Sequence, residues 1–503
     1  MTELLAGDVA AAVGARLSAG DPGRVLAGIS TDTRAIAPGQ LFVALSGPNF
    51  DGNAFAAAAV AAGAGGVLLR GEPGEPVDPS VVGDLGDAVV IAHQDPRGAL
   101  AELAAWHRRR LGLPVIGITG SCGKTTTKDY LLQLLERVRR VAGSPKSFNN
   151  DVGVPLTLLR ADAGTEVLVA ELGTSGPGEI ERLCRIATPD VGVVTNVGAS
   201  HLEGLGSLEG VAVEKAALAR SLPEGGVLVL NADCRFHEVF RAAALAKGAR
   251  VLTFSVDGDG DLNATDLVFD GGRSVFQLEG REVCLPALGT HNVQNLLAAL
   301  GACVGMGLDL DEVLPGVAEI AGASGRLETF ELAGLRLVDD SYNANPTSAR
   351  AAVRVLAGMH GHDRRVLILG DMLELGEYAA ELHHELGRTA CEAGIDRLVL
   401  VGDLCRAAAA GALEAGMPPS EVCHYATRDE AEADLHRLVQ AGDVVLVKGS
   451  RGMALERLVK ALRERFAAAP GEDTRGGGSP GSPGSSGGAR ETTMACYAGW
   501  EVR

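Results

Sequence analysis

The segment Gly117–Thr127, GITGSCGKTTT, constrains this chain most, because it joins an apolar strand-like run to a helix-like run. A glycine-rich turn in that position points several backbone N–H groups at one place, where the helix N-terminus adds positive charge. Lys124 can reach the outer phosphates of a nucleoside triphosphate, and the Thr125 hydroxyl can hold Mg²⁺. Ile118 stands where the common phosphate-binding loop has its first Gly, and the glycines instead repeat every third residue. We predict a phosphate-binding loop; the alternative is a turn that merely contains a lysine.

Length and composition exclude several classes of protein. The 503 residues suffice for about three domains. A net charge of −19 argues against binding to nucleic acid or an acidic membrane, although a local phosphate site remains compatible with it. Nine cysteines without CxxC spacing suggest neither a zinc site nor a disulfide framework. The N-terminus does not resemble a signal peptide, and the longest apolar stretch, near 56–69, is too short to span a bilayer. We expect a cytoplasmic protein that does not insert into membranes.

The alternation of strand and helix patterns predicts an α/β protein of three domains and a tail. We expect a small α/β N-terminal domain over 1–110, a central domain with a mainly parallel sheet over 111–325, and a Rossmann-like C-terminal domain over 326–466. The tail over 467–503 contains GGGSPGSPGSSGG, which is too polar and flexible to pack. The expected strands are 115–119, 167–171, 191–196, 227–231 and 251–254 in the central domain, and 335–339, 366–370, 398–402 and 444–448 in the C-terminal domain.

Residues at the carboxyl ends of the expected parallel strands are the candidates for a site, because parallel sheets bind ligands there. Glu171 ends an apolar strand and could hold Mg²⁺, or it could be a surface carboxylate. His201 follows the strand that ends near 196, and it could be a second metal ligand or an ordinary loop histidine. Lys215 lies in an apolar helical stretch over 207–220, where a charged amine is costly to bury. Its neutral amine could react with CO₂ to form a carbamate, although most helix lysines are solvated.

Two further segments carry polar residues that could meet a nucleotide. His291, Asn292 and Asn295 stand at the start of a helix, and the two asparagines share one face because they are three residues apart. Their amides could contact a purine edge, or they could cap the helix. Arg326 lies at the junction of the central and C-terminal domains, from which it could cross the cleft onto phosphates. We place a hinge at 324–326.

The ordered motifs TGSCGKTT, NNDVGVP, AELG, NVGASHLEGLGS, HNVQN and GRLE resemble those of the Mur ligases, three-domain ATP-dependent amide ligases of cell-wall synthesis. The motifs DDSYNANP (339–346), GDMLELG (370–376) and KGSRG (448–452) resemble the branch that joins D-alanyl-D-alanine to a UDP-N-acetylmuramoyl-tripeptide. The resemblance covers roughly 1–466. It implies ATP and Mg²⁺ as cofactors, an acyl-phosphate intermediate and a role in peptidoglycan synthesis, and we expect a monomer.

The resemblance also implies roles for the residues that match its motifs. ATP would be bound by Thr119, Gly120, Ser121, Cys122, Gly123, Lys124, Thr125, His291, Asn292, Asn295, Arg326 and Asp340. The other substrates would be bound by Ser30, Thr31, Asp32, Thr33, Arg34, Asn149, Asn150, Asn343 and Asn345. Metal ligands would be Thr125, Glu171, His201 and Lys215 as a carbamate, and the catalytic residues would be Lys124, Lys215 and His201. Cys122 is expected to be a tolerated small residue, not a nucleophile.

Two segments depart from the family pattern. Asn53 stands where the family commonly has a histidine in an Asp-Gly-His-x-Phe motif, so no role is carried over to it. Thr174–Pro177 stands where Asn and His often follow the acidic strand, which leaves substrate contacts there open. The third residue of the tripeptide, diaminopimelate or lysine, is equally open.

Three other functions compete with this prediction. A related ligase that adds meso-diaminopimelate or glutamate would share the central domain, although the C-terminal motifs argue against it. A phosphate-loop protein with a regulatory role would bind nucleotide without ligase activity. A phosphate-loop kinase is a weaker alternative, because it does not explain the C-terminal motifs.

Overall fold

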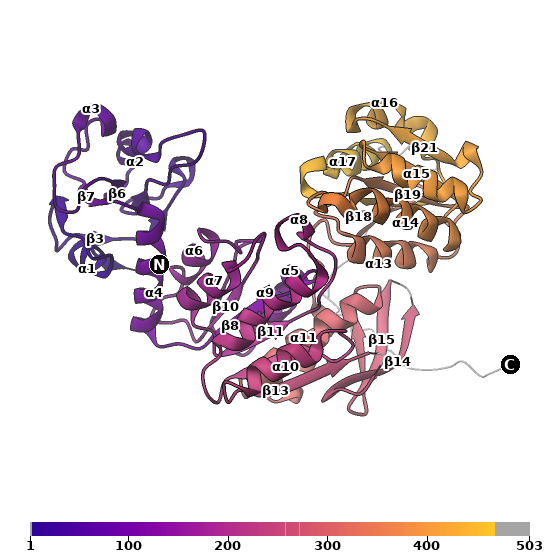
Figure 1. Ribbon diagram of the computed structural model, residues 1–503, viewed down its shortest axis with the longest axis horizontal. Coiled ribbons are helices and arrows are strands. Elements are labelled where there is room, and N and C mark those ends of the chain that lie inside the picture. Colours follow the sequence, from indigo (N-terminus) through magenta and orange to yellow (C-terminus); the bar gives the residue numbers. More distant parts are fainter. Residues whose placement is uncertain (1–2, 257, 271, 468–503) are drawn as a thin grey trace, which may run out of the picture.

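The computed structural model describes residues 3–256, 258–270 and 272–467, and it shows three α/β bodies in a row, each on its own sheet (Figure 1). The predicted α/β class and its three domains are confirmed. The exact boundaries stay predictions, and all of the predicted tail except residue 467 lies outside the described residues. Within the described ranges, no helix has both the length and the apolar character needed to cross a membrane.

The N-terminal body holds a five-stranded sheet in the order β2-β7-β6-β5-β4, which is parallel except for β2. Its strands are β1 (Leu4–Leu5), β2 (Leu17–Ala19), β3 (Val25–Leu26), β4 (Ile29–Ser30), β5 (Leu41–Val43), β6 (Gly66–Arg70) and β7 (Val89–His93), with β1 and β3 paired separately. Its helices are α1 (Ala6–Ala12), η1 (Thr33–Ala35), η2 (Gly52–Phe55), α2 (Ala56–Ala61), α3 (Pro79–Val82) and α4 (Pro96–Leu111). Buried Leu100 and Leu103 of α4 belong to a hydrophobic cluster that continues into the central body, so α4 connects the two.

The central body holds a nine-stranded sheet in the order β16-β15-β14-β13-β12-β11-β8-β10-β9. Its strands are β8 (Val115–Thr119), β9 (Val141–Gly143), β10 (Val167–Glu171), β11 (Val191–Val194), β12 (Val227–Asn231), β13 (Arg250–Ser255), β14 (Leu262–Asp270), β15 (Arg273–Leu278) and β16 (Arg281–Leu285). Its helices are α5 (Lys124–Glu136), α6 (Gly153–Leu158), α7 (Glu179–Ala187), α8 (Leu202–Leu205), α9 (Leu208–Ser221), α10 (His237–Leu245), α11 (Thr290–Gly305), α12 (Leu310–Val313) and η3 (Leu314–Glu319).

The inner strands of this sheet are buried apolar runs, as expected of parallel strands that are covered on both faces. Alternate residues of β10 reach opposite faces: Val167 and Val169 pack with α5 and α11, whereas Leu168 and Ala170 pack in the cluster that includes α6 and α7. Four of the five strand predictions match to within one residue at each end, and β11 ends two residues earlier than predicted. The parallel sheet also has the edge strand β9, which the prediction lacked.

The antiparallel extension β14-β15-β16 was not predicted. The start of β14 pairs in parallel with β13, whereas β15 and β16 continue the sheet in antiparallel order, and β14 is largely exposed past its first three residues. Such a strand mixes polar and apolar residues, so it lacks the continuous apolar run on which the prediction of buried strands relied.

The C-terminal body holds a six-stranded sheet in the order β17-β18-β22-β19-β20-β21, in which only β17 is antiparallel to its neighbour. Its strands are β17 (Glu328–Leu332), β18 (Leu335–Asp340), β19 (Arg364–Gly370), β20 (Arg397–Val401), β21 (Val422–Tyr425) and β22 (Asp443–Lys448). Its helices are α13 (Pro346–Ala357), η4 (Gly376–Tyr378), α14 (Ala379–Glu392), α15 (Cys405–Glu414), η5 (Pro419–Glu421), α16 (Arg428–Leu438), η6 (Arg451–Met453) and α17 (Glu456–Arg465).

Candidate active site

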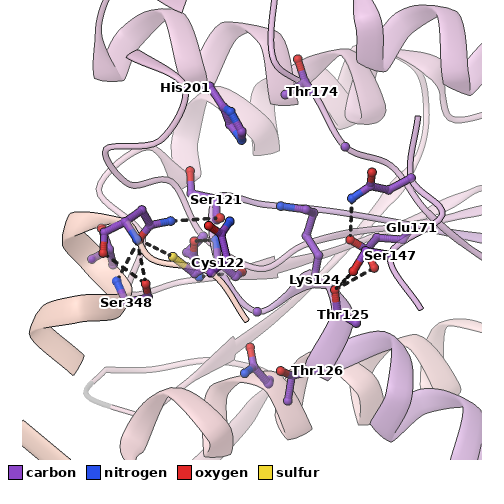
Figure 2. A pocket seen from close by; sticks show the side chains of 18 of the residues that line it. Ser121, Cys122, Lys124, Thr125, Thr126, Ser147, Glu171, Thr174, His201 and Ser348 are labelled. Atoms are coloured by element: carbon purple, nitrogen blue, oxygen red, sulfur yellow. Dashed lines mark hydrogen bonds between the residues drawn. The ribbon is translucent and has the colours of Figure 1, made fainter. Parts of the chain in front are cut away.

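A cavity of about 870 Å³ lies where the central and C-terminal bodies meet, and the phosphate loop forms part of its wall (Figure 2). The predicted site residues that line it are Ser121, Cys122, Gly123, Lys124, Thr125, Asn149, Asn150, Glu171, His201, His291, Asn292, Asn295, Arg326, Asp340, Asn343 and Asn345. Thr119, Gly120, Lys215 and the segment Ser30–Arg34 are not among the lining residues. One cavity therefore gathers residues from seven separate motifs of the sequence.

The phosphate loop turns between β8 and α5 on two glycines with positive φ, Gly120 at +153° and Gly123 at +80°. A Cβ atom on Gly120 would collide with the Thr195 hydroxyl, and one on Gly123 would collide with the Asn295 amide oxygen. The loop is also held by the segment that follows β11: the Asn196 side-chain oxygen accepts a hydrogen bond of 2.9 Å from the Cys122 N–H. The glycines are thus required both by conformation and by the space around the loop.

Lys124 begins α5 and folds back over the loop, where its Nζ donates to the Gly120 carbonyl at 2.7 Å. Burial lowers the pKa of Lys124, and the nearby Glu171 carboxylate opposes that shift. Figure 2 shows Lys124 between the loop and the group formed by Thr125, Ser147 and Glu171. The amine is therefore positioned beside the place where phosphate oxygens would be held.

Glu171, at the carboxyl end of β10, is buried and carries two hydrogen bonds on its carboxylate. Thr125 Oγ1 donates to Oε2 at 2.9 Å, and Asn149 Nδ2 donates to Oε1 at 2.8 Å. Arg326 Nη2 reaches from the other side of the domain junction and donates to Thr125 Oγ1 at 2.9 Å. The surface-carboxylate alternative for Glu171 is wrong, because its exposed fraction is only 1 %.

Lys215 lies on α9, with an exposed fraction of 1 %. Burial, with a smaller contribution from the Lys124 charge, lowers its pKa from 10.5 to about 7. Among the described residues, its Nζ has neither a hydrogen bond nor an ion pair. The neighbouring Glu214 instead accepts hydrogen bonds from the N–H groups of Gly178 and Ile180 at the start of α7. The solvated alternative for Lys215 is therefore wrong.

His291 and the two asparagines lie at the start of α11, on the other wall of the cavity. The alternative that they cap this helix is wrong, because its N-cap is Gly289 and no side chain caps it. Asn292 Nδ2 donates to the Leu288 carbonyl at 2.9 Å, and burial lowers the pKa of His291 to about 4. His291 is accordingly neutral near pH 7 and can offer a neutral ring to a nucleotide base.

The C-terminal body contributes residues from the ends of β18 and β22. Lys448 Nζ donates to Asp340 Oδ2 at 2.6 Å and to the Asn343 carbonyl at 3.0 Å. Asn345 caps α13 through its hydrogen bond from the Ser348 N–H, and it also accepts a hydrogen bond from the Cys122 thiol at 3.1 Å. Asn345 was predicted to bind substrate. In the structure its side chain caps α13 and contacts Cys122 of the phosphate loop.

The predicted site set lacked Tyr342, Ser147 and Lys448, which are among the residues that line the cavity. Tyr342 donates to Ser147 Oγ at 2.7 Å across the domain junction, and the Arg326 guanidinium stacks 4.3 Å from the centre of the Tyr342 ring. Lys448 is the third, and its position in the KGSRG motif is the signal that could have identified it.

Ser30–Arg34 lie on the N-terminal body at the end of β4, apart from the cavity. Arg34 binds Asp32 in a two-point ion pair, with Nε–Oδ1 at 2.9 Å and Nη2–Oδ2 at 2.8 Å. This hydrogen-bonded arginine lowers the pKa of Asp32 to about 2. The role of this segment in binding a substrate stays a prediction.

Asn53, which stands where the family commonly has a histidine, makes structural hydrogen bonds within the N-terminal body. Its side chain donates to the Arg70 carbonyl and accepts from the Arg70 N–H, both at 2.9 Å, at the end of β6.

We expect Asn53→Ala to lower the free energy of unfolding by about 1–3 kcal/mol, because it removes two part-buried hydrogen bonds to the backbone of Arg70. Urea unfolding of this variant and of Glu75→Ala, an exposed position in the same body, measures the difference. Equal midpoints for the two variants would contradict the expectation.

Asp371, His383 and Cys405 form a buried cluster with metal-ligand residue types in the C-terminal body. Its ligand atoms are already engaged: His383 Nε2 accepts from the Met372 N–H at 2.9 Å, and Asp371 Oδ1 accepts from the Cys405 N–H at 2.9 Å. Burial raises the pKa of the Cys405 thiol, which disfavours the thiolate that a metal needs. The cluster acts as a structural anchor for the segment that follows β19.

Comparison with known proteins gives consistent matches along the chain. Residues 118–303 match the Mur ligase middle domain, 325–451 the Mur ligase, glutamate ligase domain, and 25–108 the Mur ligase family, catalytic domain. The UDP-N-acetylmuramoyl-tripeptide–D-alanyl-D-alanine ligase of Escherichia coli is 38% identical over 442 residues, 87% of this chain and 93% of that protein. The Bacillus subtilis protein of the same name is 36% identical, over 88% of this chain and 94% of its own length.

Solved structures agree with these matches. MurF from Acinetobacter baumannii superposes with a TM-score of 0.83 at 32% identity, covering 92% of this chain and 99% of that one. MurF ligase from Thermotoga maritima in complex with ADP gives a TM-score of 0.74 at 28% identity, covering 87% of this chain and 97% of that one.

Proposed function

Because the chain belongs to the Mur ligase family, we propose that it joins D-alanyl-D-alanine to UDP-N-acetylmuramoyl-tripeptide in an ATP-dependent reaction that yields the pentapeptide precursor of peptidoglycan. The observation that carries the proposal is the cavity between the central and C-terminal bodies. It combines a phosphate loop with the DDSYNANP and KGSRG motifs, the segments that distinguish this branch of the family. We further propose a cytoplasmic location, since the reaction consumes ATP, and a monomeric state.

The reaction has two steps. The terminal carboxylate of the tripeptide attacks the γ-phosphorus of ATP, so that a C–O–P linkage forms, the bond to the β-phosphate oxygen breaks and ADP leaves. The amine of D-alanyl-D-alanine then attacks the acyl carbon, and the tetrahedral intermediate loses its proton from nitrogen and expels phosphate. Lys124 and Arg326 would offset the charge on the transferring phosphoryl group. The contacts of Arg326 and Tyr342 across the junction would limit access of water, which would otherwise hydrolyse the acyl phosphate.

The residues at the Thr125 end of the cavity fit Mg²⁺, because a hydroxyl, a carboxylate and an amide offer the hard oxygen ligands that this ion prefers. Thr125 and Glu171 would hold it there, and bound Mg²⁺ would offset negative charge on phosphate oxygens.

Lys215 fits the carbamate proposed for it. The amine is buried, lacks a hydrogen-bond or ion-pair partner among the described residues, and has a pKa near 7. A substantial fraction is therefore neutral at physiological pH and can add to CO₂, which converts a buried cation into an anion. Such an anion, together with His201, would suit a second Mg²⁺.

The decisive experiment measures phosphate release from ATP with UDP-N-acetylmuramoyl-tripeptide, with D-alanyl-D-alanine supplied or omitted, and identifies the product by mass. We expect release to depend on the dipeptide and to match the amount of pentapeptide formed. Tripeptides with diaminopimelate and with lysine are compared in parallel. Equal or better turnover with meso-diaminopimelate or glutamate as the amine would favour a related ligase. Nucleotide binding without any phosphate release would favour a regulatory protein.

A further inference from the structure

We propose that Glu374 of the C-terminal body is a positioning residue for His201 of the central body, so that His201 is oriented toward the metal site only when the two bodies are in contact. The inference rests on the proposed function, because it takes His201 as a ligand of the second Mg²⁺. Glu374 lies in the GDMLELG motif between β19 and η4, a segment to which the proposed reaction assigns no role.

The contact between the two residues crosses the domain junction. His201 Nδ1 and Glu374 Oε2 lie 2.6 Å apart, and the Glu203 N–H of α8 donates to the Glu374 carbonyl at 3.4 Å. The loop thus touches both the imidazole and the first turn of the helix that follows it. Figure 2 shows the His201 ring pointing into the cavity above the phosphate loop.

This arrangement leaves the other ring nitrogen for a metal. When Nδ1–H donates to the carboxylate, Nε2 is unprotonated and keeps its lone pair. In the part of the chain that the structure describes, Nε2 has no hydrogen-bond partner. A carboxylate that binds the second nitrogen of a ligating histidine is a recurring arrangement, because it sets both the tautomer and the orientation of the ring.

The backbone supports a specific docked geometry. His201 has φ +53° and Glu374 has φ +62°, in the left-handed region that residues with a Cβ rarely adopt. Such conformations persist where the surroundings impose them, and they concentrate at functional sites. His201 and Glu374 both have this backbone conformation, and they are in direct contact across the domain junction.

The loop that carries Glu374 is fixed to the C-terminal body. The Leu373 N–H donates to Ser450 Oγ at 2.9 Å, the Ser450 N–H donates to the Asp371 carbonyl at 3.1 Å, and the Met372 N–H donates to His383 at 2.9 Å. Glu374 therefore moves with the C-terminal body, and separation of the two bodies would withdraw its carboxylate from His201.

The test compares Glu374→Ala and Glu374→Gln with Glu377→Ala, a matched control three residues further along, in η4, whose side chain is exposed. Mn²⁺ binding is titrated by electron paramagnetic resonance, with a non-hydrolysable ATP analogue and the tripeptide present. We expect the weaker of two Mn²⁺ affinities to fall about 10–100-fold in Glu374→Ala. Glu374→Gln should recover part of this loss, and Glu377→Ala should match the unmodified protein. The KM for Mg²⁺ should rise more than kcat falls.

A double-variant comparison separates positioning from other causes. If Glu374 acts through His201, adding Glu374→Ala to His201→Ala should cause no further loss of Mn²⁺ affinity. Additive losses, unchanged Mn²⁺ binding in Glu374→Ala, or only one Mn²⁺ per unmodified chain would each overturn the inference. The 59% exposed Glu374 side chain makes unfolding of the variant unexpected, and thermal unfolding checks this. Failure of the proposed function would appear separately, as absence of dipeptide-dependent phosphate release from the unmodified chain.

Discussion

Lys124→Ala is expected to lower ATP-dependent coupling by at least about 10³-fold while the protein remains folded. The amine lies beside the place where phosphate oxygens would be held, and its charge would become most important as the phosphoryl group transfers. Removing it deletes one hydrogen bond, to the Gly120 carbonyl, and leaves in place the glycine turns and the hydrogen bond that the Cys122 N–H donates to Asn196. Phosphate release under saturating substrates measures the effect, and circular dichroism with thermal unfolding measures the fold.

The matched control is Lys247→Ala, which removes an exposed lysine that follows α10. This variant should retain the activity and the melting temperature of the unmodified protein. Near-normal turnover in Lys124→Ala would contradict the assignment of the phosphate loop and, with it, the proposed chemistry.

Lys215→Ala is expected to lower turnover by about 10²–10³-fold, and added formate, acetate or propionate should restore part of it. Truncation opens space on α9 that a small carboxylate can enter, where it would supply the anion that the proposed carbamate would supply in the unmodified protein. Relative to unmodified protein without the carbamate, the melting temperature should be unchanged or higher, because a buried amine without a partner is costly to keep. Turnover is measured against the concentration of each acid.

The control for this rescue is acetamide, which has a similar size and no charge and should restore nothing. In the unmodified protein, activity should fall as the pH drops below about 7, because protonation of Lys215 removes the amine that reacts with CO₂. Between pH 7 and 10.5 the unfolded chain binds more protons at this residue than the folded one, so stability without the carbamate should rise with pH across that window. Full activity of Lys215→Ala would refute the carbamate.

The sequence predicted those features that depend on local patterns. Continuous apolar runs such as Val115–Thr119 identify buried parallel strands, and their carboxyl ends place Glu171 near the loop of Lys124. The strands β14, β15 and β16 were not predicted, because their exposure depends on which elements pack beside them in space. The local sequence pattern of β14 does not indicate a strand.

The contacts across the domain junction were not predictable in the same way. From residue types alone, His201 was about equally compatible with a metal ligand and with an ordinary loop histidine. The resemblance to the Mur ligases favoured the metal ligand. The pairs Tyr342–Ser147 and Glu374–His201 join positions more than 170 residues apart, 195 and 173 in sequence separation. Their existence depends on how one body docks on another, which no run of residues encodes by itself.

The crowding around Gly120 and Gly123 bears on how this site can change under selection. At both positions the backbone has positive φ, and any added side chain meets Thr195 or Asn295. Few substitutions within the turn could therefore prevent a compound from binding to its backbone and still preserve function. Replacements of these glycines that repel the compound also distort the nucleotide pocket. Resistance would have to arise in surrounding residues, and those in direct contact with the turn are themselves part of its support.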